Sequence, residues 1–262
     1  MARPSGTANN AFPRDFRIIG RMDPTTVPST PAALFWAALP IGAYLVGSFP
    51  TAHLLAKSRG VDLGSVGSKS YGATNLGRTL GKPWGIACFL LDATKGAIPV
   101  VAAGALLGTL GARPGGLSVE SAWCWLATAA GAIVGHTLSP WIGFRGGKGV
   151  ATGFGAFAAM WPVLTVPALL ALVVWTVLVL VFRMVSLASM VAAVVVPCAV
   201  AVTAFAGAGV EGVRAVVPFL AASGVVAAFV VFKHRSNIAR IRAGTESKVL
   251  QKNPSPAAEP KP

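Results

Sequence analysis

The chain has 262 residues, of which 54% are hydrophobic and only 11% are charged, and its mean hydropathy is +0.68. These values exclude an ordinary soluble globule and predict an integral membrane protein, because too few charges exist to cover a soluble surface. The net charge of +14 favours anionic lipid head groups or phosphorylated substrates as partners over nucleic acid.

Both ends of the chain differ from its middle. Residues 1–30 are polar and contain no apolar stretch followed by a small-residue cleavage site, so we expect no signal peptide. Residues 253–262 are rich in proline and lack bulky apolar side chains. We therefore expect a disordered N-terminal extension over 1–30, one membrane domain over 31–252 and a disordered tail over 253–262.

Six apolar runs lie between these ends, at about residues 31–56, 83–110, 121–141, 149–182, 186–208 and 213–232. The fourth run would be about 51 Å long as one helix, too long for one crossing of a core about 30 Å thick and too short for two. We expect Pro162 to divide it into a short helix over 149–161 and a full crossing over 163–182. The sequence therefore predicts an all-α protein with seven transmembrane helices.

Basic residues concentrate in four of the connections between these helices. They lie in residues 57–82, in 145–148, at Arg183 and in 233–252, and all four connections share one side of the membrane if there are seven passes. Because Lys and Arg favour the cytoplasmic side, we place the N-terminus outside and the C-terminus in the cytoplasm. The arginines within residues 1–30 disagree with this assignment.

The connection over residues 60–82 is dense in Gly, Ser, Thr and Asn. These residue types expose backbone amides and hydroxyls, and Arg78 and Lys82 add the charge that a phosphate cradle needs. The alternative is an ordinary solvated connection between two helices.

Asp92 and Lys95 stand about one helical turn apart inside the second apolar run. Charges are costly in lipid, so both residues are candidates for a functional site. The alternative is an i,i+3 ion pair that neutralises itself and holds helices together.

The stretch FRGGKGVATG, at residues 144–153, resembles a nucleotide-binding loop but lacks its parts. Gly149 follows Gly147-Lys148 where a phosphate loop needs Ser or Thr to bind magnesium. Arg145 and Lys148 still supply charge, and a short helix that starts near Gly149 points its positive end at an anion. His136, just upstream, is either part of this site or a satisfied histidine at a helix end.

The fourth polar cluster is the segment over residues 232–249. His234, Asn237 and Arg240 recur every three residues, so they share one face if the helix continues. A basic run that anchors lipid head groups explains most of the charges, but not the histidine and the asparagine. Four clusters rich in hydroxyl, amide and cationic groups thus share one membrane face, which predicts a small phosphorylated substrate.

The segments GSFP, VGSKSYGATNLGRTLGK, LLDATKGAIPV, GH before GFRGGKGVAT, VSLAS and KHRSNIARIRAGTE occur in this order. With them the chain resembles, over residues 39–248, the PlsY-type bacterial acyl-phosphate:glycerol-3-phosphate acyltransferases. The resemblance implies a seven-pass protein of the bacterial cytoplasmic membrane that moves a fatty acyl group from acyl-phosphate to the 1-hydroxyl of glycerol 3-phosphate. The products would be lysophosphatidic acid, for phospholipid biosynthesis, and phosphate.

The residue patterns and this resemblance together give a set of site residues. The candidate catalytic residues are Lys148, His234, Asn237 and Ser68, and the candidate substrate- and phosphate-binding residues are Gly67, Thr74, Asn75, Arg78, Lys95, His136, Arg145, Gly146, Gly147, Gly149, Ser186 and Arg240. The general base is either His234 or the substrate's own phosphate. The family's first loop usually reads Gly-Ser-Gly-Asn, whereas this chain has Gly67-Ser68-Lys69-Ser70.

The chemistry that the resemblance implies needs little from outside the chain. An acyl-phosphate is already activated, so we expect no metal, nucleotide or other cofactor, and we expect the protein to act as a monomer. Acyltransferases with a His-four residues-Asp motif are disfavoured, because Ser58, Trp141 and Ala239 stand five residues after the three histidines.

A transporter for an anionic phosphorylated solute is the alternative function, since it would also need half-helices and a basic cavity. It predicts inverted repeats, and no convincing similarity relates the two halves of the chain.

Overall fold

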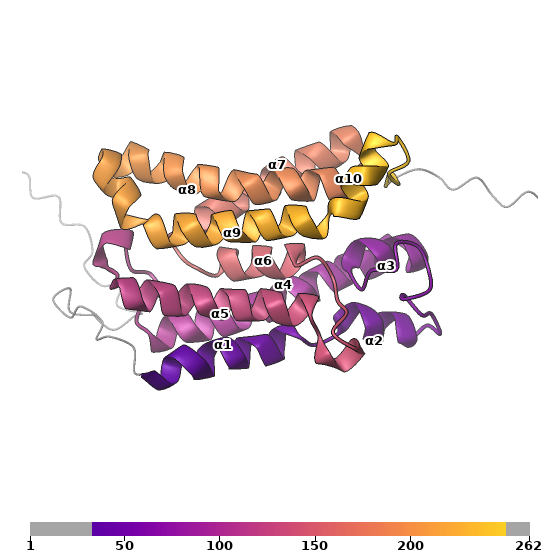
Figure 1. Ribbon diagram of the computed structural model, residues 1–262, viewed down its shortest axis with the longest axis horizontal. Coiled ribbons are helices and arrows are strands. Elements are labelled where there is room, and N and C mark those ends of the chain that lie inside the picture. The colour runs from indigo at the N-terminus through magenta and orange to yellow at the C-terminus, as the bar shows by residue number, and fades with distance from the viewer. Residues whose placement is uncertain (1–32, 250–262) are drawn as a thin grey trace, which may run out of the picture.

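The structure is a computed structural model that describes residues 33–249, and every regular element in that range is helical (Figure 1). Within these residues the only β pairing is an isolated bridge between Ser139 and Arg145. The predicted all-α class is therefore confirmed for the described chain. The segments predicted to be disordered, residues 1–30 and 253–262, lie outside the described residues.

The helices are α1 (Ala33–Gly47), α2 (Thr51–Lys57), α3 (Ala73–Leu80), α4 (Lys82–Leu106), α5 (Val119–Thr137), α6 (Val150–Ala158), α7 (Thr165–Phe182), α8 (Val185–Ala215), α9 (Val217–Lys233) and α10 (Arg235–Arg242). Two short 3-10 turns, η1 (Pro114–Gly116) and η2 (Pro140–Ile142), precede α5 and α6.

Within residues 33–249, fewer helices are long and apolar enough to span a membrane than the seven expected. Four segments pass that test: α1 together with α2, then α4, α7 and α8. A fifth passes if α9 and α10 are taken together across their 57° bend. The count of seven is therefore not confirmed, because α5 does not pass the test and the nine residues of α6 span only about 14 Å.

The fourth apolar run is divided as expected, but over a longer break. The short helix α6 ends at Ala158 and α7 begins at Thr165, so Pro162 lies in the turn between them. The Thr165 hydroxyl donates to the Ala158 carbonyl at 2.8 Å, which satisfies one of the open carbonyls at the end of α6.

The connection over residues 60–82 contains a helix that the sequence reading missed. The backbone is extended at Gly72 and then enters α3, whose Leu76 is fully buried beside Leu63 and Cys88. Its apolar residues Ala73, Leu76 and Leu80 recur at helical spacing, but eight residues within a loop dense in Gly and Ser are too short a stretch to stand out in the sequence. The end of the fifth apolar run, expected at residue 208, coincides with a non-helical kink of α8 at Ala208 and Gly209.

Small residues set the distances between the helices. Gly131 and Gly135 of α5 lie against backbone carbonyls of α1, and Gly155 of α6 lies against the Ala93 carbonyl of α4, so that a Cβ at any of the three would collide. Such small residues let backbones approach closely in membrane proteins, where the lipid is as apolar as the side chains.

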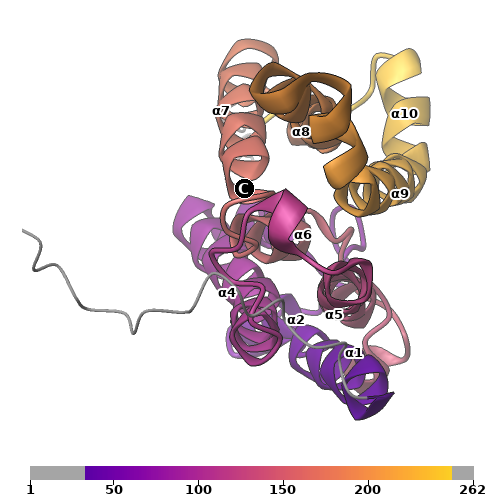
Figure 2. The same cartoon turned by 90° about the vertical axis from the view of Figure 1, so that its left-hand side faces the viewer.

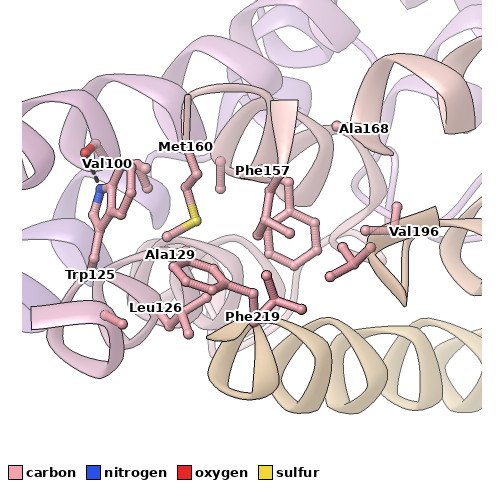
Figure 3. Packing of buried hydrophobic residues seen from close by; sticks show 14 of the residues in the cluster. Val100, Trp125, Leu126, Ala129, Phe157, Met160, Ala168, Val196 and Phe219 are labelled. Atoms are coloured by element: carbon pink, nitrogen blue, oxygen red, sulfur yellow. Dashed lines mark hydrogen bonds between the residues drawn. The ribbon is translucent and has the colours of Figure 1, made fainter. Parts of the chain in front are cut away.

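The helices form two groups with α6 between them. Seen from one end, α1, α4 and α5 lie on one side of α6, and α7, α8 and α9 lie on the other (Figure 2). The apolar core fills the space around α6, where Phe157, Met160 and Phe219 pack together (Figure 3). Trp125 joins this core and donates its indole N–H to the Val100 carbonyl at 2.8 Å.

Candidate functional site

A polar cavity of about 100 Å³ opens at the end of the bundle that carries α2, α3 and α10 (Figure 1). The four basic connections of the sequence reach this same end, where the Val249 amide also donates to the Arg183 carbonyl at 2.7 Å. The cavity lining brings together these predicted residues: Ser68, Thr74, Asn75, Arg78, His136, Lys148, Ser186, His234 and Asn237.

Lys148 reaches the cavity from the turn before α6. Gly149 caps that helix at φ +83°, in the left-handed region that glycine adopts without strain. The Lys148 ammonium donates to the Asn237 side-chain oxygen, across 89 positions of sequence. Burial lowers the pKa of Lys148 to about 8; the charges of Arg240 and Arg78 act in the same direction, and Glu246 opposes them.

Glu246, which the sequence analysis did not single out, lines the cavity and joins three of the predicted residues by hydrogen bonds. One carboxylate oxygen accepts hydrogen bonds from the Ser186 hydroxyl and the Asn237 amide, both at 2.7 Å, and the other accepts from Arg240 Nε at 2.8 Å. Burial alone would raise the pKa of Glu246, but these three hydrogen bonds outweigh it and the pKa is lowered. A signal existed, because Glu246 is the one acid in the basic segment over residues 232–249.

His234 lies at the bend between α9 and α10. Its ring is buried, and Nδ1 lies 2.7 Å from the Val230 carbonyl. A carbonyl only accepts, so Nδ1 carries the proton and Nε2 is left as an acceptor nitrogen. The helix does not run straight from His234 to Arg240 as the spacing assumed, because the 57° bend falls immediately after His234.

Asn75 holds the loop before α3 in shape. Its side-chain oxygen accepts from the Ser68 amide at 3.0 Å, and its side-chain nitrogen donates to the carbonyls of Leu63, Val66 and Ser70 at 3.4, 3.2 and 3.1 Å. The residue is almost fully buried, so this amide positions the loop as well as lining the cavity.

The same loop contains two left-handed residues. Gly67 has φ +56°, and a Cβ there would collide with the Asn75 side-chain oxygen. Lys69 has φ +54°, a conformation that costs a residue with a Cβ about 1–2 kcal/mol. The structure thus gives a reason for the glycine that is usual in the family at this position.

Arg78 links α3 to the last described segment. Its Nη2 donates to the Ser247 carbonyl at 2.9 Å, and its side chain lines the cavity. Burial lowers the pKa of Arg78, Glu246 raises it and Arg240 lowers it further. A guanidinium remains charged despite such a shift, so Arg78 is a permanent cation of the cavity.

Lys95 does not reach the cavity. Its ammonium lies 2.7 Å from Asp92 and donates to the Phe49 carbonyl at 2.8 Å, so the ion-pair alternative describes it. Asp92 lines the cavity instead, with its carboxylate 3.6 Å from Nδ1 of His136.

The remaining predicted residues surround the cavity without lining it. Gly146 and Gly147 lie so close to His136 and Thr137 that a Cβ would collide with them, so these glycines serve packing. Arg145 is exposed, and the charge of Arg240 is directed at Glu246. Gly149 lines the neighbouring apolar pocket.

An apolar pocket of about 70 Å³ adjoins the polar cavity between α6, α7, α8 and α9. The two share Phe89, Val150, Trp175 and Ser189. A molecule with an anionic group and a hydrocarbon chain therefore finds a cationic cavity and an apolar pocket side by side.

Comparison with known proteins adds independent findings. The family model for glycerol-3-phosphate acyltransferase matches residues 37–244. A glycerol-3-phosphate acyltransferase of Geotalea daltonii is 43% identical over 207 residues, which cover 79% of this chain and 94% of that protein. The enzyme of the same name from Trichlorobacter lovleyi is 42% identical over 217 residues, covering 83% of this chain and 97% of that protein.

Two crystal structures resemble this chain. One is PlsY, an integral membrane glycerol 3-phosphate acyltransferase, in its glycerol 3-phosphate form, with a TM-score of 0.67 at 35% identity. The other is the lysophosphatidic acid form, with a TM-score of 0.64 at 34% identity. Each alignment covers 81% of this chain and 94% of the solved chain.

Proposed function

Because the chain belongs to the glycerol-3-phosphate acyltransferase family, we propose that it transfers a fatty acyl group from an acyl-phosphate to the 1-hydroxyl of glycerol 3-phosphate. It is an integral membrane acyltransferase of phospholipid synthesis that acts on glycerol 3-phosphate. The identity of the donor and the roles of the residues are our proposal.

One observation carries the donor assignment: the polar cavity with Lys148 and Arg78 adjoins an apolar pocket and shares four lining residues with it. An acyl-phosphate has a phosphate at one end and a hydrocarbon chain at the other, with the reactive carbonyl at their junction. Placed here, its phosphate would contact the two cations, and its carbonyl would lie near Phe89 and Trp175, where cavity and pocket meet.

The proposed reaction is a direct transfer. The 1-hydroxyl of glycerol 3-phosphate attacks the carbonyl carbon, a new ester C–O bond forms, and the bond from the carbonyl carbon to the phosphate oxygen breaks. Lys148, held by Asn237, stabilises the charge that develops on the leaving phosphate. The hydroxyl proton goes to Nε2 of His234 or to the phosphate of the acceptor itself.

The other predicted residues support this geometry. We assign phosphate contacts to Ser68, Thr74, Arg78 and Ser186, all of which line the cavity. Asn75, Gly67, Gly146, Gly147, Gly149, Lys95, His136, Arg145 and Arg240 shape or position the cavity walls. Acyl-phosphate is an activated donor, so the reaction as proposed consumes no nucleotide.

We place the protein in the bacterial cytoplasmic membrane with seven passes: α1 with α2, α4, α5, the short α6, α7, α8 and α9. The basic end of the bundle, with the cavity and the C-terminus, then faces the cytoplasm, and the N-terminus lies outside. We propose that the protein acts as a monomer. The transporter alternative gains no support, since the matched family and relatives are acyltransferases.

The deciding experiment uses the purified full chain with an acyl-phosphate and glycerol 3-phosphate, without coenzyme A, and measures lysophosphatidic acid. We expect product with acyl-phosphate and none when acyl-coenzyme A replaces it. Product from the thioester alone would overturn the donor assignment. No product from either donor, with stable folding shown, would overturn the acyltransferase mechanism.

A further inference from the structure

The apolar pocket runs along α6, away from Lys148. Its lining begins at Gly149 and ends on this helix at Phe157, a length of about 12 Å at 1.5 Å per residue. Its two polar side-chain groups satisfy each other, because the Trp175 indole donates to the Ser189 hydroxyl at 3.1 Å. The pocket therefore offers contacts to hydrocarbon and no free polar side-chain group.

The far end of the pocket lies against the apolar core. Phe157 lies there with Ala168 of α7 and Val196 of α8, and behind it are Met160 and Phe219, which are 0% and 1% exposed (Figure 3). Interiors of this kind are close-packed, so a hydrocarbon chain cannot extend further without displacing core side chains.

Two aromatic rings, those of Phe89 and Trp175, lie at the near end. Phe89 stacks on Trp175 with ring centroids 6.5 Å apart, and on Phe154 with centroids 6.0 Å apart. Phe89 and Trp175 line both the polar cavity and the apolar pocket. Phe89 and Trp175 therefore mark the end of the pocket nearest the polar cavity, and Phe157 marks the opposite end.

We propose that this pocket measures the acyl chain: the carbonyl lies beside Phe89 and Trp175, the methyl end lies against Phe157, and Phe157 thereby sets the preferred chain length. The inference rests on the proposed function, because the donor must bring a hydrocarbon chain to this junction. Each methylene that the pocket can bury should improve kcat/KM roughly fourfold, and methylenes beyond the floor should not.

The test measures kcat/KM of the purified protein with a series of saturated acyl-phosphates whose neighbours differ by two methylenes. Phe157→Leu lowers the floor, so the preferred donor should become longer and the ratio between neighbouring donors should change by roughly tenfold. Ala192→Leu, on the α8 wall, narrows the pocket and should change the ratio in the opposite direction. A ratio within one variant is insensitive to the fraction of protein that is folded.

Matched controls lie on the outer face of α8. Phe205 is 60% exposed and Val194 is 48% exposed, and neither lines the apolar pocket. Phe205→Leu and Val194→Leu should therefore keep the chain-length profile of the unsubstituted protein. Unchanged profiles for both Phe157→Leu and Ala192→Leu would overturn the proposal and place the chain outside this pocket, in the bilayer.

If the donor assignment is wrong, the unsubstituted protein will give no product with any acyl-phosphate, and this outcome is distinct from an unchanged chain-length profile. The pocket can then be tested without turnover, by thermal stabilisation of each variant with lysophosphatidic acids of graded length. Phe157→Leu should still shift the length that stabilises best, and an unshifted optimum would overturn the measuring role.

Discussion

Lys148 holds a charge where its surroundings disfavour one. It is half-buried, and Arg78 and Arg240 are close enough to lower its pKa further. A bound phosphate dianion reverses this balance, because it supplies the opposite charge that the cavity lacks. The same features that make the ammonium costly in the free protein thus strengthen its attraction for a phosphorylated substrate.

The lowered pKa predicts the pH dependence of activity. With the pKa of Lys148 at about 8, its cationic form dominates below that pH and is lost above it, so kcat/KM for glycerol 3-phosphate should fall as pH rises through about 8. Lys148→Arg should move any remaining activity's decline to higher pH, because a guanidinium stays charged. Steady-state rates across this range check the prediction, and a profile that is flat through pH 8 would contradict it.

Removal of the Lys148 ammonium should abolish turnover. We expect Lys148→Ala to lower kcat by at least about a hundredfold, the size of effect seen when one donor to a developing charge is lost. Cys124→Ala is the control: Cys124 is fully buried in the core but lines neither the cavity nor the pocket, so its activity should stay near normal. Equal losses in the two variants would mean that the site lies elsewhere.

Lys69 predicts a gain of stability by substitution. Lys69→Gly should raise the free energy of unfolding by about 1 kcal/mol, because glycine adopts φ +54° without strain. Lys69→Ala keeps the Cβ and removes only the charge, so it should give no such gain. Unfolding in detergent with both variants separates the backbone effect from the charge effect, and equal gains would assign the effect to charge.

The close contact between α6 and α4 at Gly155 predicts a loss of stability on substitution. Gly155→Ala would place a Cβ onto the Ala93 carbonyl between α6 and α4, so α6 must shift, and we expect a loss of about 1–3 kcal/mol. Gly224→Ala on α9 is matched to it, since no atom lies within 4 Å of the added Cβ. Thermal unfolding should therefore separate the two variants, and similar melting temperatures would show that the α4–α6 contact is not tight.

Elements were predictable from the sequence where a strong local signal existed. Pro162 indicated the break between α6 and α7, and the kink of α8 at Ala208 fell where the apolar run ended. The helix α3 was missed because it has only eight residues and lies within a stretch dense in Gly, Ser and Thr, although Ala73, Leu76 and Leu80 recur at helical spacing. Local pattern therefore predicted the apolar helices better than the polar ones that form the cavity wall.

Individual contacts of the site were less predictable. The cation Lys148 was visible in the sequence, but its bond to Asn237 spans 89 positions and depends on how the turn before α6 lies against α10. Gly146 and Gly147 suggested a phosphate-binding turn, which stays a prediction, but their close packing against His136 was not visible in the sequence. A single sequence identifies chemical groups, but their partners follow from the tertiary arrangement.

Basic residues of the described chain concentrate at the end of the bundle that carries α2, α3 and α10, and this asymmetry predicts the orientation of the protein in the membrane. In a chain whose three native cysteines are replaced by Ala, Arg113→Cys lies before α5 and Lys82→Cys lies at the start of α4, at opposite ends of the bundle. An impermeant maleimide added to intact cells should label the first variant and not the second. Labelling of Lys82→Cys alone would show that the protein has the opposite orientation.

The three hydrogen bonds to Glu246 also bear on the order of synthesis. Chains emerge from the ribosome N-terminus first, so Lys148, Ser186 and Asn237 are all made before the carboxylate that joins two of them. A nascent chain that stops after α9 has every apolar helix but no closed cavity wall. We therefore expect acylation of glycerol 3-phosphate to begin only after residues 232–249 have been synthesised. Incomplete chains in the membrane should be inactive.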